Sequence, residues 1–457
     1  MKQEKALEIL KSGHNILLTG PAGTGKTYIL NEFIEYFRGK GSNIAITAST
    51  GIAATHINGR TIHSWAGLGI KQDLTQADLR KIVSNPAVRS RIKNADVLII
   101  DEISMLHDFQ LDMVDLIYRA IRHDDRPLGG VQLILCGDFF QLPPVDKGRS
   151  SGDFITKSEV WGRLNLKICY LTKQHRQSDN SLNDLLLSIR LGDVSQDHIN
   201  SLKNRLNADL KQKEEVTKLF THNINVDTIN LNKLKSLEEE EHIYKAKGEG
   251  KKALVDVLIK NCLAPEELIL KRNAIVMFVK NDFAKGYVNG TIGKVIGFDD
   301  DGYPIVRTRN GKRIVATPTD WAVEENNSIL ATITQVPLRL AWAITVHKSQ
   351  GMTLDAAEID LSRAFTFGLG YVALSRVRSL ENLTLLGINN LALKVSEEAK
   401  QIDADLQMLS KEAEKEDYEE MTFRKNYQED STLAKRIRAG LDTAFKQSKK
   451  KAKPKKK

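Results

Sequence analysis

Short apolar runs alternate with longer segments of helical pattern through the first 170 residues. The candidate strands are residues 15–19, 43–48, 97–101, 132–137 and 166–171, and segments that fit helices, such as Lys26 to Tyr36, lie between them. Strands and helices that alternate in this way predict a parallel sheet covered by helices. A second alternating region begins near Leu182 and includes a candidate strand at 219–222.

The pattern changes between residues 268 and 335, where short β-rich runs such as IVMFVK and YPIVRTR are separated by Gly, Asn and Asp. The Asn-Gly pairs at 289–290 and 310–311 are signals for tight turns. We expect a small antiparallel barrel inserted into the second α/β region, whose pattern returns after Leu338 and continues to Ile388. The densely charged stretch 236–252 reads as a loop or surface hairpin.

The net charge of +9 comes mainly from the end of the chain. Residues 446–457 hold eight lysines and no acidic residue, and 67 basic residues less those eight leave 59 against 58 acidic ones. Like charges and a lack of apolar residues predict that this tail is disordered. It either adds salt-sensitive attraction to phosphates or has no dedicated role.

Composition narrows the class of protein further. No apolar run approaches the roughly 20 residues needed to span a bilayer, and the N-terminus lacks a signal-peptide h-region. We therefore expect a cytoplasmic protein without a membrane partner. The cysteines Cys136, Cys169 and Cys262 lie far apart, so neither a zinc site nor a disulfide framework is suggested, and a reducing compartment is the default.

Residues 20–27, GPAGTGKT, fit the phosphate-binding pattern G-x-x-x-x-G-K-[ST] at every fixed position. They follow a predicted strand and open a predicted helix, which is the context that this pattern requires. The glycines let backbone N–H groups turn toward phosphate oxygens, Lys26 reaches the β- and γ-phosphates, and the Thr27 hydroxyl holds Mg²⁺. The chain is therefore expected to bind a nucleoside triphosphate.

Further candidate residues follow two other predicted strands. Asp101, after VLII, is placed to hold Mg²⁺, and Glu102 to polarise the attacking water. The strand QLILC runs into GDFFQLPP, where Gln141 is a candidate sensor of the γ-phosphate. Phe139 and Phe140 either join the core or lie against a nucleobase, and we name Phe140 as the candidate nucleic-acid contact.

Arg176 and Arg376 lie on different parts of the chain, in LTKQHRQ and YVALSR. ATP hydrolysis by a P-loop domain usually needs a cation supplied to the transition state, worth about 10³–10⁵ in rate. Two such arginines imply an ATP cleft between two lobes. The run TVHKSQG at 345–351 places His347 and Lys348 at a predicted helix start, where phosphates bind, although His347 alone would also fit a core histidine.

Six sequence blocks occur in the order GPAGTGKT, IIDEISM, CGDFFQLPPV, LTKQHRQSD, TVHKSQGMTLD and YVALSRV. Together they resemble the motifs of superfamily-one DNA helicases. The stretches 48–54 and 61–67 resemble the Pif (petite integration frequency) helicases in particular, and the block 121–130 is similar to that family's signature sequence. Residues 221–227 and 288–290 also match, so the likeness covers roughly residues 1–388.

The resemblance implies an α/β fold with two RecA-like parallel-sheet domains that form an ATP cleft. The first spans 1–175 with a small insertion at about 50–75, and the second spans 176–267 and 336–390. An SH3-like β-barrel insertion is implied at 268–335. A charged helical C-terminal region at 391–445 and a disordered polylysine tail at 446–457 complete the chain.

The resemblance also implies an enzyme: an ATP- and Mg²⁺-dependent motor that moves 5′-to-3′ on single-stranded DNA and opens duplex at junctions. Family members also act on G-quadruplexes and RNA–DNA hybrids, and we expect a monomer in solution. Carried over by position, Gln3 would read adenine, and Gln141, Arg176, Gly351 and Arg376 would meet the γ-phosphate. The phosphate loop would comprise Gly20, Pro21, Ala22, Gly23, Thr24, Gly25, Lys26 and Thr27, and the DNA track Ser49, Thr50, His63, Asn223, His347 and Lys348.

The sequence departs from the family pattern at three places. His175 stands where an apolar residue is expected, the long N-terminal extension of eukaryotic relatives is absent, so mitochondrial targeting is not expected, and 391–457 matches nothing. Two alternatives remain: a motor of opposite polarity or a RecD-like subunit, and an ATPase that remodels protein–DNA complexes without processive unwinding. An ATPase unrelated to nucleic acid leaves GDFFQLPPV, VHKSQG and YVALSR together unexplained.

Overall fold

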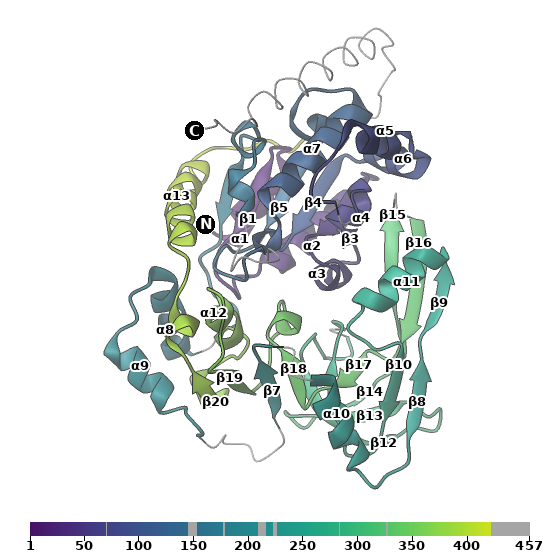
Figure 1. Ribbon diagram of the computed structural model, residues 1–457, viewed down its shortest axis with the longest axis vertical. Helices are drawn as coiled ribbons and strands as arrows, with labels where there is room; N and C mark the ends of the chain where they lie inside the picture. Colours follow the sequence, from purple (N-terminus) through teal and green to yellow (C-terminus); the bar gives the residue numbers. More distant parts are fainter. Residues whose placement is uncertain are drawn as a thin grey trace, which may run out of the picture.

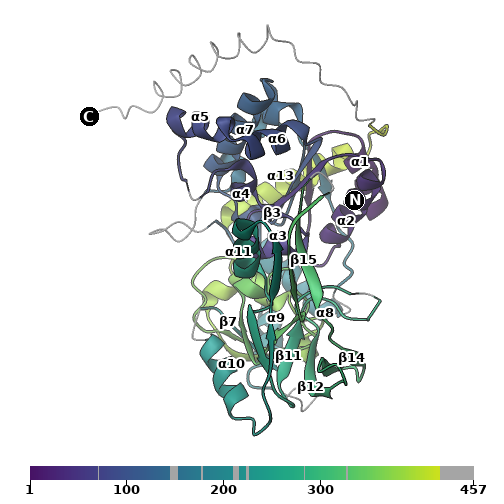
Figure 2. The same ribbon diagram turned by 90° about the vertical axis from the view of Figure 1, so that its right-hand side faces the viewer.

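The computed structural model describes residues 1–69, 71–144, 153–176, 179–208, 216–222, 226–282, 284–325 and 328–421. The lysine-rich tail at 446–457 and Asn223 therefore lie outside the described residues. The described chain contains two parallel sheets, a set of antiparallel strands and the helices that connect and cover them (Figure 1, Figure 2). Within these ranges, no helix is both long and apolar enough to cross a membrane.

The first lobe is built on a six-stranded parallel sheet in the order β3-β2-β4-β5-β1-β6. Its strands are β1 (Ile16–Thr19), β2 (Ile44–Ala48), β3 (Arg60–Thr61), β4 (Val97–Asp101), β5 (Gln132–Cys136) and β6 (Lys167–Tyr170). Five of them confirm strands predicted from apolar runs. Successive side chains point to opposite faces, so Leu17 joins one buried cluster, and Ile16 and Leu18 join the other.

Helices cover both faces of this sheet (Figure 1). They are α1 (Gln3–Lys11), α2 (Lys26–Gly39), α3 (Gly51–His56), α4 (Ile62–Ala66), α5 (Gln76–Ser84), α6 (Pro86–Asn94) and α7 (Asp108–Arg122). Short 3-10 turns lie at Ile103–Met105, Pro127–Gly130, Ile155–Lys157 and Trp161–Arg163. The helix predicted from Lys26 begins at that residue, as the phosphate-loop pattern requires.

The second lobe contains a four-stranded parallel sheet in the order β18-β7-β19-β20. Its strands are β7 (Thr217–Phe220), β18 (Ala343–Thr345), β19 (Ala357–Leu361) and β20 (Leu383–Ile388), and its helices are α8 (Asn180–Leu191), α9 (Gln196–Lys203), α10 (Val226–Lys235) and α12 (Leu369–Leu374). Strands β7 and β18 are neighbours in the sheet although the antiparallel insertion separates them in sequence. The prediction of two parallel-sheet domains is confirmed.

The insertion contains only antiparallel pairings among its described strands. One sheet has the order β14-β13-β12-β11-β17, a second has β15-β16-β9, and a third pairs β10 with β8. The bounds are β8 (His242–Lys245), β9 (Lys247–Gly250), β10 (Glu267–Leu270), β11 (Ile275–Phe278), β12 (Ile292–Phe298), β13 (Pro304–Thr308), β14 (Arg313–Val315), β15 (Thr319–Glu325), β16 (Ser328–Gln335) and β17 (Leu338–Leu340). The SH3-like barrel itself stays a prediction.

The reading of 236–252 as a loop or surface hairpin is wrong. Strands β8 and β9 lie within it and join different sheets, because β8 pairs with β10 and β9 with β16. Antiparallel structure therefore begins at His242, ahead of the predicted start at 268. The strands were not predicted because most of their side chains face solvent and many are charged. They form only by pairing with strands that are distant in sequence.

A long helix, α13 (Glu397–Ala413), follows the second lobe and lies within the region expected to be charged and helical. It packs on β6, the edge strand of the first lobe's sheet. Figure 1 shows α13 at the upper left. The backbone N–H of Tyr170 donates to the Ser410 hydroxyl at 3.1 Å, and that of Met421 donates to the Lys11 carbonyl at 2.9 Å. The C-terminal region therefore ties the second lobe back to the first.

Candidate active site

The phosphate loop joins β1 to α2 and depends on backbone conformations that only glycine adopts easily. Gly20, Gly23 and Gly25 have φ values of +136°, +91° and +85°. The Lys26 ammonium turns back into the loop and donates to the carbonyls of Gly20 (2.8 Å) and Pro21 (3.1 Å). Burial lowers the pKa of Lys26, against the opposing charge of Asp138, so a bound phosphate would supply the anion that this ammonium lacks.

Gln3 and Thr27 are both predicted to contact the nucleotide, and they lie beside this loop and at its end. The Gln3 side-chain amide donates to the Thr24 carbonyl at 3.1 Å, and a Cβ on Gly25 would stand 2.3 Å from the same amide nitrogen. Gln3 therefore lies over the loop, beside the first turn of α2. Thr27 lies in that turn with an exposed side chain. All eight residues from Gly20 to Thr27 thus share one strand–loop–helix unit.

The acidic pair ends β4. Asp101 is 8% exposed, and its carboxylate accepts from the backbone N–H of Glu102 at 2.8 Å. Glu102 has a φ of +54°, a strained conformation for a residue with a side chain. Burial, and then the charge of Asp101, raise the pKa of Glu102 to about 7. A carboxyl group with a raised pKa beside a phosphate loop is suited to accept a proton from water.

The donor set fits Mg²⁺, which prefers hard oxygen ligands and binds through one or two protein oxygens together with substrate phosphates. Thr27 offers a hydroxyl and Asp101 a carboxylate at the same end of the sheet. Among the described residues no group of three or more His, Cys, Asp or Glu side chains is placed to enclose a metal ion.

Gln350, which the sequence analysis quoted in TVHKSQG but gave no role, joins two predicted site residues. Its side-chain amide donates to a Glu102 carboxylate oxygen at 3.0 Å and to the Gln141 side-chain oxygen at 3.3 Å. Gln350 comes from the second lobe and the other two from the first. The only signal in the sequence was its position directly before Gly351.

Both arginines converge on the same cleft. Arg376 is 1% exposed and donates only to uncharged groups: the carbonyls of Val372, Ser349 and Met352 and the Ser375 hydroxyl. Arg176 donates to the Ser375 carbonyl at 3.3 Å. Burial, and then the charge of Arg176, lower the pKa of Arg376. Among the described residues neither guanidinium forms an ion pair, so the buried Arg376 and the partly buried Arg176 together favour an anion.

Two residues predicted for the DNA track, Phe140 and Ser49, are buried. Phe140 is 3% exposed, with the Arg190 guanidinium carbon 4.1 Å from its ring centre, so its assignment as a base contact is wrong. Its neighbour Phe139 is buried too. Ser49 is buried, and its hydroxyl donates to the Glu102 carbonyl at 2.6 Å, so it connects to the hydrolytic site.

The remaining track predictions have mixed placements. Thr50 caps α3, where its hydroxyl accepts from the backbone N–H of Ala53 at 3.2 Å. His63 is partly buried on α4, and burial lowers its pKa. Gly351 has a φ of +75° and lies against His56 of α3, so its contact with a phosphate stays a prediction.

An aromatic group on the second lobe was missed by sequence reasoning. Phe365 is 48% exposed, and its ring centre lies 4.9 Å from that of His222 and 6.3 Å from that of His347. The rings of His347 and Phe365 are nearly parallel, at 15°. Lys348 follows His347 in the sequence and is partly buried. An exposed phenylalanine beside two histidines and a lysine is suited to stack a base and contact its phosphate.

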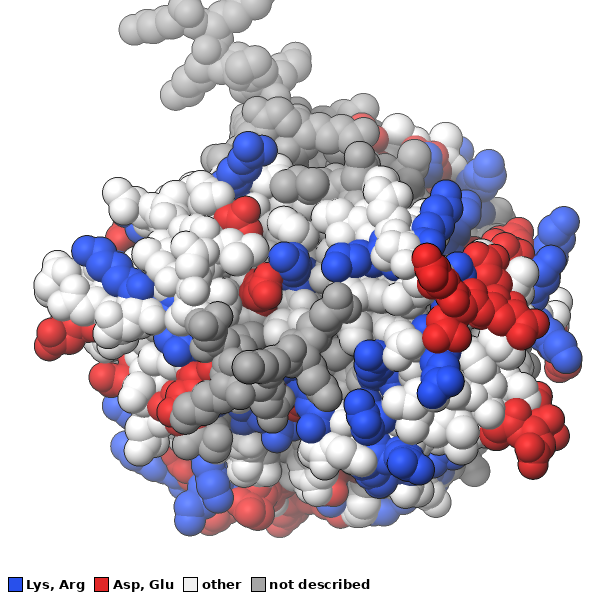
Figure 3. Space-filling model, turned by 90° about the horizontal axis from the view of Figure 1, so that it is seen from below, with Lys and Arg blue, Asp and Glu red and all other residues white. Residues whose placement is uncertain are grey.

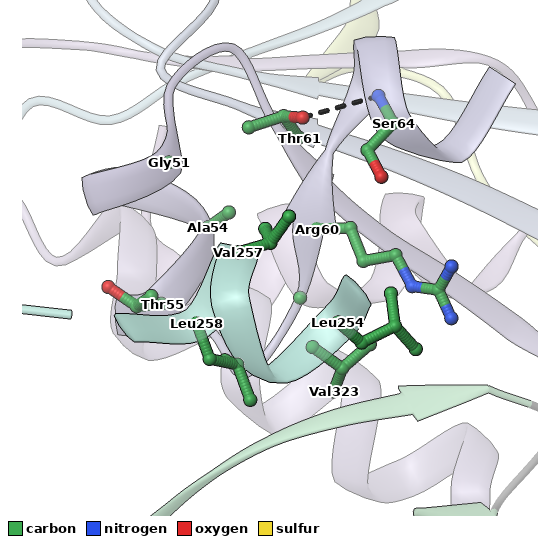
Figure 4. A pocket seen from close by; sticks show the side chains of 11 residues that line it. Gly51, Ala54, Thr55, Arg60, Thr61, Ser64, Leu254, Val257, Leu258 and Val323 are labelled. Carbon is green, nitrogen blue, oxygen red and sulfur yellow. Dashed lines mark hydrogen bonds between the residues drawn. The ribbon is translucent and has the colours of Figure 1, made fainter. Parts of the chain in front are cut away.

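The antiparallel insertion makes a second contact with the first lobe. Helix α11 (Lys252–Asn261) packs against α3, and its Leu254, Val257 and Leu258 line a pocket together with residues of α3, β3 and α4 of the first lobe (Figure 4). Further along α3, His56 meets the Asn289 side chain at 3.1 Å. The antiparallel insertion therefore touches the first lobe beside Thr50 and His63.

Charge on the exterior does not define the site. In the view from below, lysine and arginine side chains occur alongside acidic ones and neither sign covers the whole face (Figure 3). This fits a folded body whose charges nearly balance. The grouping of Lys26, Arg176 and Arg376 around Glu102 says more about where an anion binds than the net charge does.

The chain is similar to known proteins along most of its length. A family model described as PIF1-like helicase matches residues 2–199. The ATP-dependent DNA helicase Pif1 of Psychrobacter sp. (strain PRwf-1) is 43% identical, over 99% of this chain and 78% of that relative. The chain spans 59 to 64% of the length of the vertebrate relatives that it matches.

Solved structures of a Bacteroides protein share the fold. Bacteroides sp Pif1 in complex with ADP-AlF4 has a TM-score of 0.77 and 31% identity, with 89% of this chain and 96% of that chain covered. Bacteroides Pif1 bound to ssDNA has a TM-score of 0.59 and 32% identity, with 90% and 97% covered.

Proposed function

The chain belongs to the PIF1-like helicase family, and on that premise we propose that it is an ATP-dependent DNA helicase. It would bind single-stranded DNA and its junctions with duplex, and use ATP hydrolysis to move along one strand. The observation that carries the proposal is the grouping of Arg376, Arg176 and the phosphate-loop residue Lys26 around Glu102. The relatives crystallised with ADP-AlF4 and with ssDNA support both ligands.

The side chains divide the chemical work as follows. Lys26 would bind the β- and γ-phosphates, and Thr27 and Asp101 would hold Mg²⁺, which would supply charge neutralisation on the phosphates. Glu102 would accept a proton from the attacking water, and Gln350, which donates to Glu102 and to Gln141, holds the Glu102 carboxylate in place. Arg176 and Arg376 donate to the charge that develops on the transferred phosphoryl group. Because the arginines and Gln350 belong to other parts of the chain than the loop, nucleotide binding favours closure of the two lobes.

DNA would be gripped on both lobes, at Thr50 and His63 on the first and at His347, Lys348 and Phe365 on the second. Asn223 stays in the proposed track by resemblance alone. We assign 5′-to-3′ polarity, action on G-quadruplexes or RNA–DNA hybrids, a monomeric state in solution and a cytoplasmic location as further parts of this proposal. Contacts to backbone and stacking would make the grip tolerant of sequence and sensitive to salt.

Replacing Phe365 with alanine should weaken binding of a single-stranded oligonucleotide by about 5- to 100-fold, because base–aromatic stacking is worth about 1–3 kcal/mol. Fluorescence anisotropy at fixed salt measures the dissociation constant. Phe365→Trp keeps an aromatic face and should bind within a few-fold of wild type, whereas Phe365→Leu keeps only apolar volume and should resemble alanine. Equal affinities for all four proteins would remove Phe365 from the DNA track.

The proposed function is tested with two matched duplexes, one with a 5′ single-stranded tail and one with a 3′ tail, and with Lys26→Ala as the inactive control. Wild type should separate only the 5′-tailed substrate. Separation of the 3′-tailed duplex instead would keep the motor and reverse its polarity. DNA-stimulated ATP hydrolysis without strand separation would indicate a remodelling ATPase or a subunit that requires its partner. Hydrolysis that survives in Lys26→Ala would disprove the site.

A further inference from the structure

An extensive buried network of charged groups centres on Arg190, a residue of α8 to which the sequence gave no role. Arg190 is 4% exposed, and its guanidinium lies over the Phe140 ring. One nitrogen donates to both oxygens of Asp138, at 2.8 and 2.9 Å, and another donates to Asp403 of α13 at 2.8 Å. A single guanidinium therefore connects the end of β5 in the first lobe to the C-terminal helix.

The network reaches the phosphate loop through Tyr371. The Tyr371 hydroxyl accepts from the backbone N–H of Ala22 at 3.0 Å and from Arg190 at 3.1 Å, and donates to Asp138 at 3.2 Å. One donor and two acceptor positions are thus all used. Tyr371 lies in α12, three residues before the last residue of that helix, Leu374, and Arg376 follows the helix. The position of this hydroxyl therefore affects how the arginine-bearing segment sits against the loop.

Asp138 also shapes the turn that carries Gln141. Its carboxylate accepts from the backbone N–H of Phe140 at 3.2 Å, and its carbonyl accepts from that of Gln141 at 3.0 Å. Arg190 thereby holds two elements of the cleft through a single carboxylate: the turn before Gln141 and the hydroxyl of Tyr371.

The far side of Arg190 is completed by α13. Asp403 accepts from the Tyr170 hydroxyl at 2.9 Å, and Tyr170 in turn accepts from Arg190 at 3.0 Å. Gln407 donates to the other Asp403 oxygen at 2.7 Å. Although burial disfavours the charge, Asp138 and its neighbours raise the pKa of Arg190 well above its ordinary value. A buried guanidinium whose two terminal nitrogens both donate to fixed partners permits little variation in geometry.

We propose that Arg190, braced by Asp403 on the C-terminal helix, is a positioning residue of ATP hydrolysis that sets Tyr371 against the phosphate loop. The inference rests on the proposed function. Among the described residues, Arg190 makes no hydrogen bond to a side chain assigned to nucleotide binding. Of the predicted DNA contacts it touches only Phe140, which is buried. It acts by aligning α12, and with it Arg376, with the loop and with Gln141. The helix α13 is then part of the ATP-hydrolysing unit.

The test compares Tyr371→Phe and Asp403→Asn with Tyr118→Phe in the full chain. Tyr118 is a matched control because its buried hydroxyl accepts a hydrogen bond, from Trp65 at 2.7 Å, within the first lobe's core. Tyr371→Phe removes only the hydroxyl, and with it the hydrogen bonds to Ala22, Arg190 and Asp138, and should lower the kcat of DNA-stimulated ATP hydrolysis by about 5-fold or more. The KM for ATP and the melting temperature should follow the Tyr118→Phe control.

Asp403→Asn keeps the shape of the side chain but removes a charge that Arg190 faces, and should lower kcat by about tenfold or more. Both variants should lose affinity for ADP with aluminium fluoride and Mg²⁺ by the same factor as kcat, while affinity for ADP changes less than twofold. The double variant should lose less than the product of the single effects, because both act through Arg190.

The proposal is overturned if both variants keep kcat within twofold of the control, if the loss appears in KM alone, or if the two effects multiply independently. A fall in kcat that matches only a smaller folded fraction also overturns it. If wild type itself shows no DNA-stimulated hydrolysis and no affinity for the aluminium fluoride complex, the proposed function fails and the positioning role with it. If wild type is active and the variants behave like Tyr118→Phe, only the positioning role fails.

Discussion

Replacing Arg376 with alanine should lower the kcat of DNA-stimulated ATP hydrolysis by about 10³-fold or more, the scale of an arginine that stabilises phosphoryl transfer. The guanidinium is buried, has no acidic partner among the described residues, and faces Arg176 and Glu102. Its charge is therefore costly until an anion arrives, and the transferred phosphate supplies that anion. Arg376→Lys keeps a charge but not the forked geometry, and should recover little of the rate.

Single-turnover hydrolysis at saturating ATP and DNA measures this effect. Arg122→Ala is a matched control, because Arg122 also donates mainly to backbone carbonyls, those of Gly129, Ile92, Lys93 and Ala95, away from the cleft. The control should lose stability yet keep the kcat of its folded fraction. If Arg376→Ala behaves like this control, Arg376 is a structural arginine.

Replacing Glu102 with glutamine should lower kcat by about 10²–10⁴-fold, the range for a removed general base. The amide keeps the side-chain shape but cannot accept the proton of the attacking water. The affinity for ATP should change less than threefold, because the phosphates are bound by the loop rather than by this carboxylate. The variant should be at least as stable as wild type, since it removes a charge whose burial is unfavourable.

Quenched-flow hydrolysis and ATP titration separate the two effects. Asp112→Asn is the matched control, because the Asp112 carboxylate accepts hydrogen bonds from Ser158 and Val160 outside the cleft. The control should retain kcat and lose stability instead. A Glu102→Gln variant that hydrolyses ATP within tenfold of wild type would transfer the role of base to another group.

Local patterns predicted the parallel strands and the phosphate loop well. The strand at 97–101 was visible because a strand covered on both faces buries every residue, and such a run stands out without tertiary information. The loop was visible because its glycines have positive φ angles, a requirement set by the backbone itself. Charged strands such as β9 were missed because their four residues are exposed and only pairing with β16 orders them.

The candidate site was predicted only where function requires a fixed spacing. Lys26, Asp101 and Glu102 follow strands directly, so the parallel sheet brings them to one edge. Gln350, Phe365 and Arg190 had no such signal, because a glutamine, an exposed phenylalanine and a helical arginine are common on surfaces. Phe140 was assigned wrongly because the turn after β5 directs its ring inward, under Arg190.

The sequence by itself determined the nucleotide loop, the order of elements in two parallel-sheet domains and the family to which the chain belongs. Each depends on residues within a few positions of one another, whose backbone geometry and burial a local pattern expresses. Only the tertiary structure decided that Arg376 and Gln350 face Glu102, that Ser49 and Phe140 are buried, and that α13 returns to brace Arg190. Those contacts join residues far apart along the chain, and packing of the two lobes, rather than any spacing, brings them together.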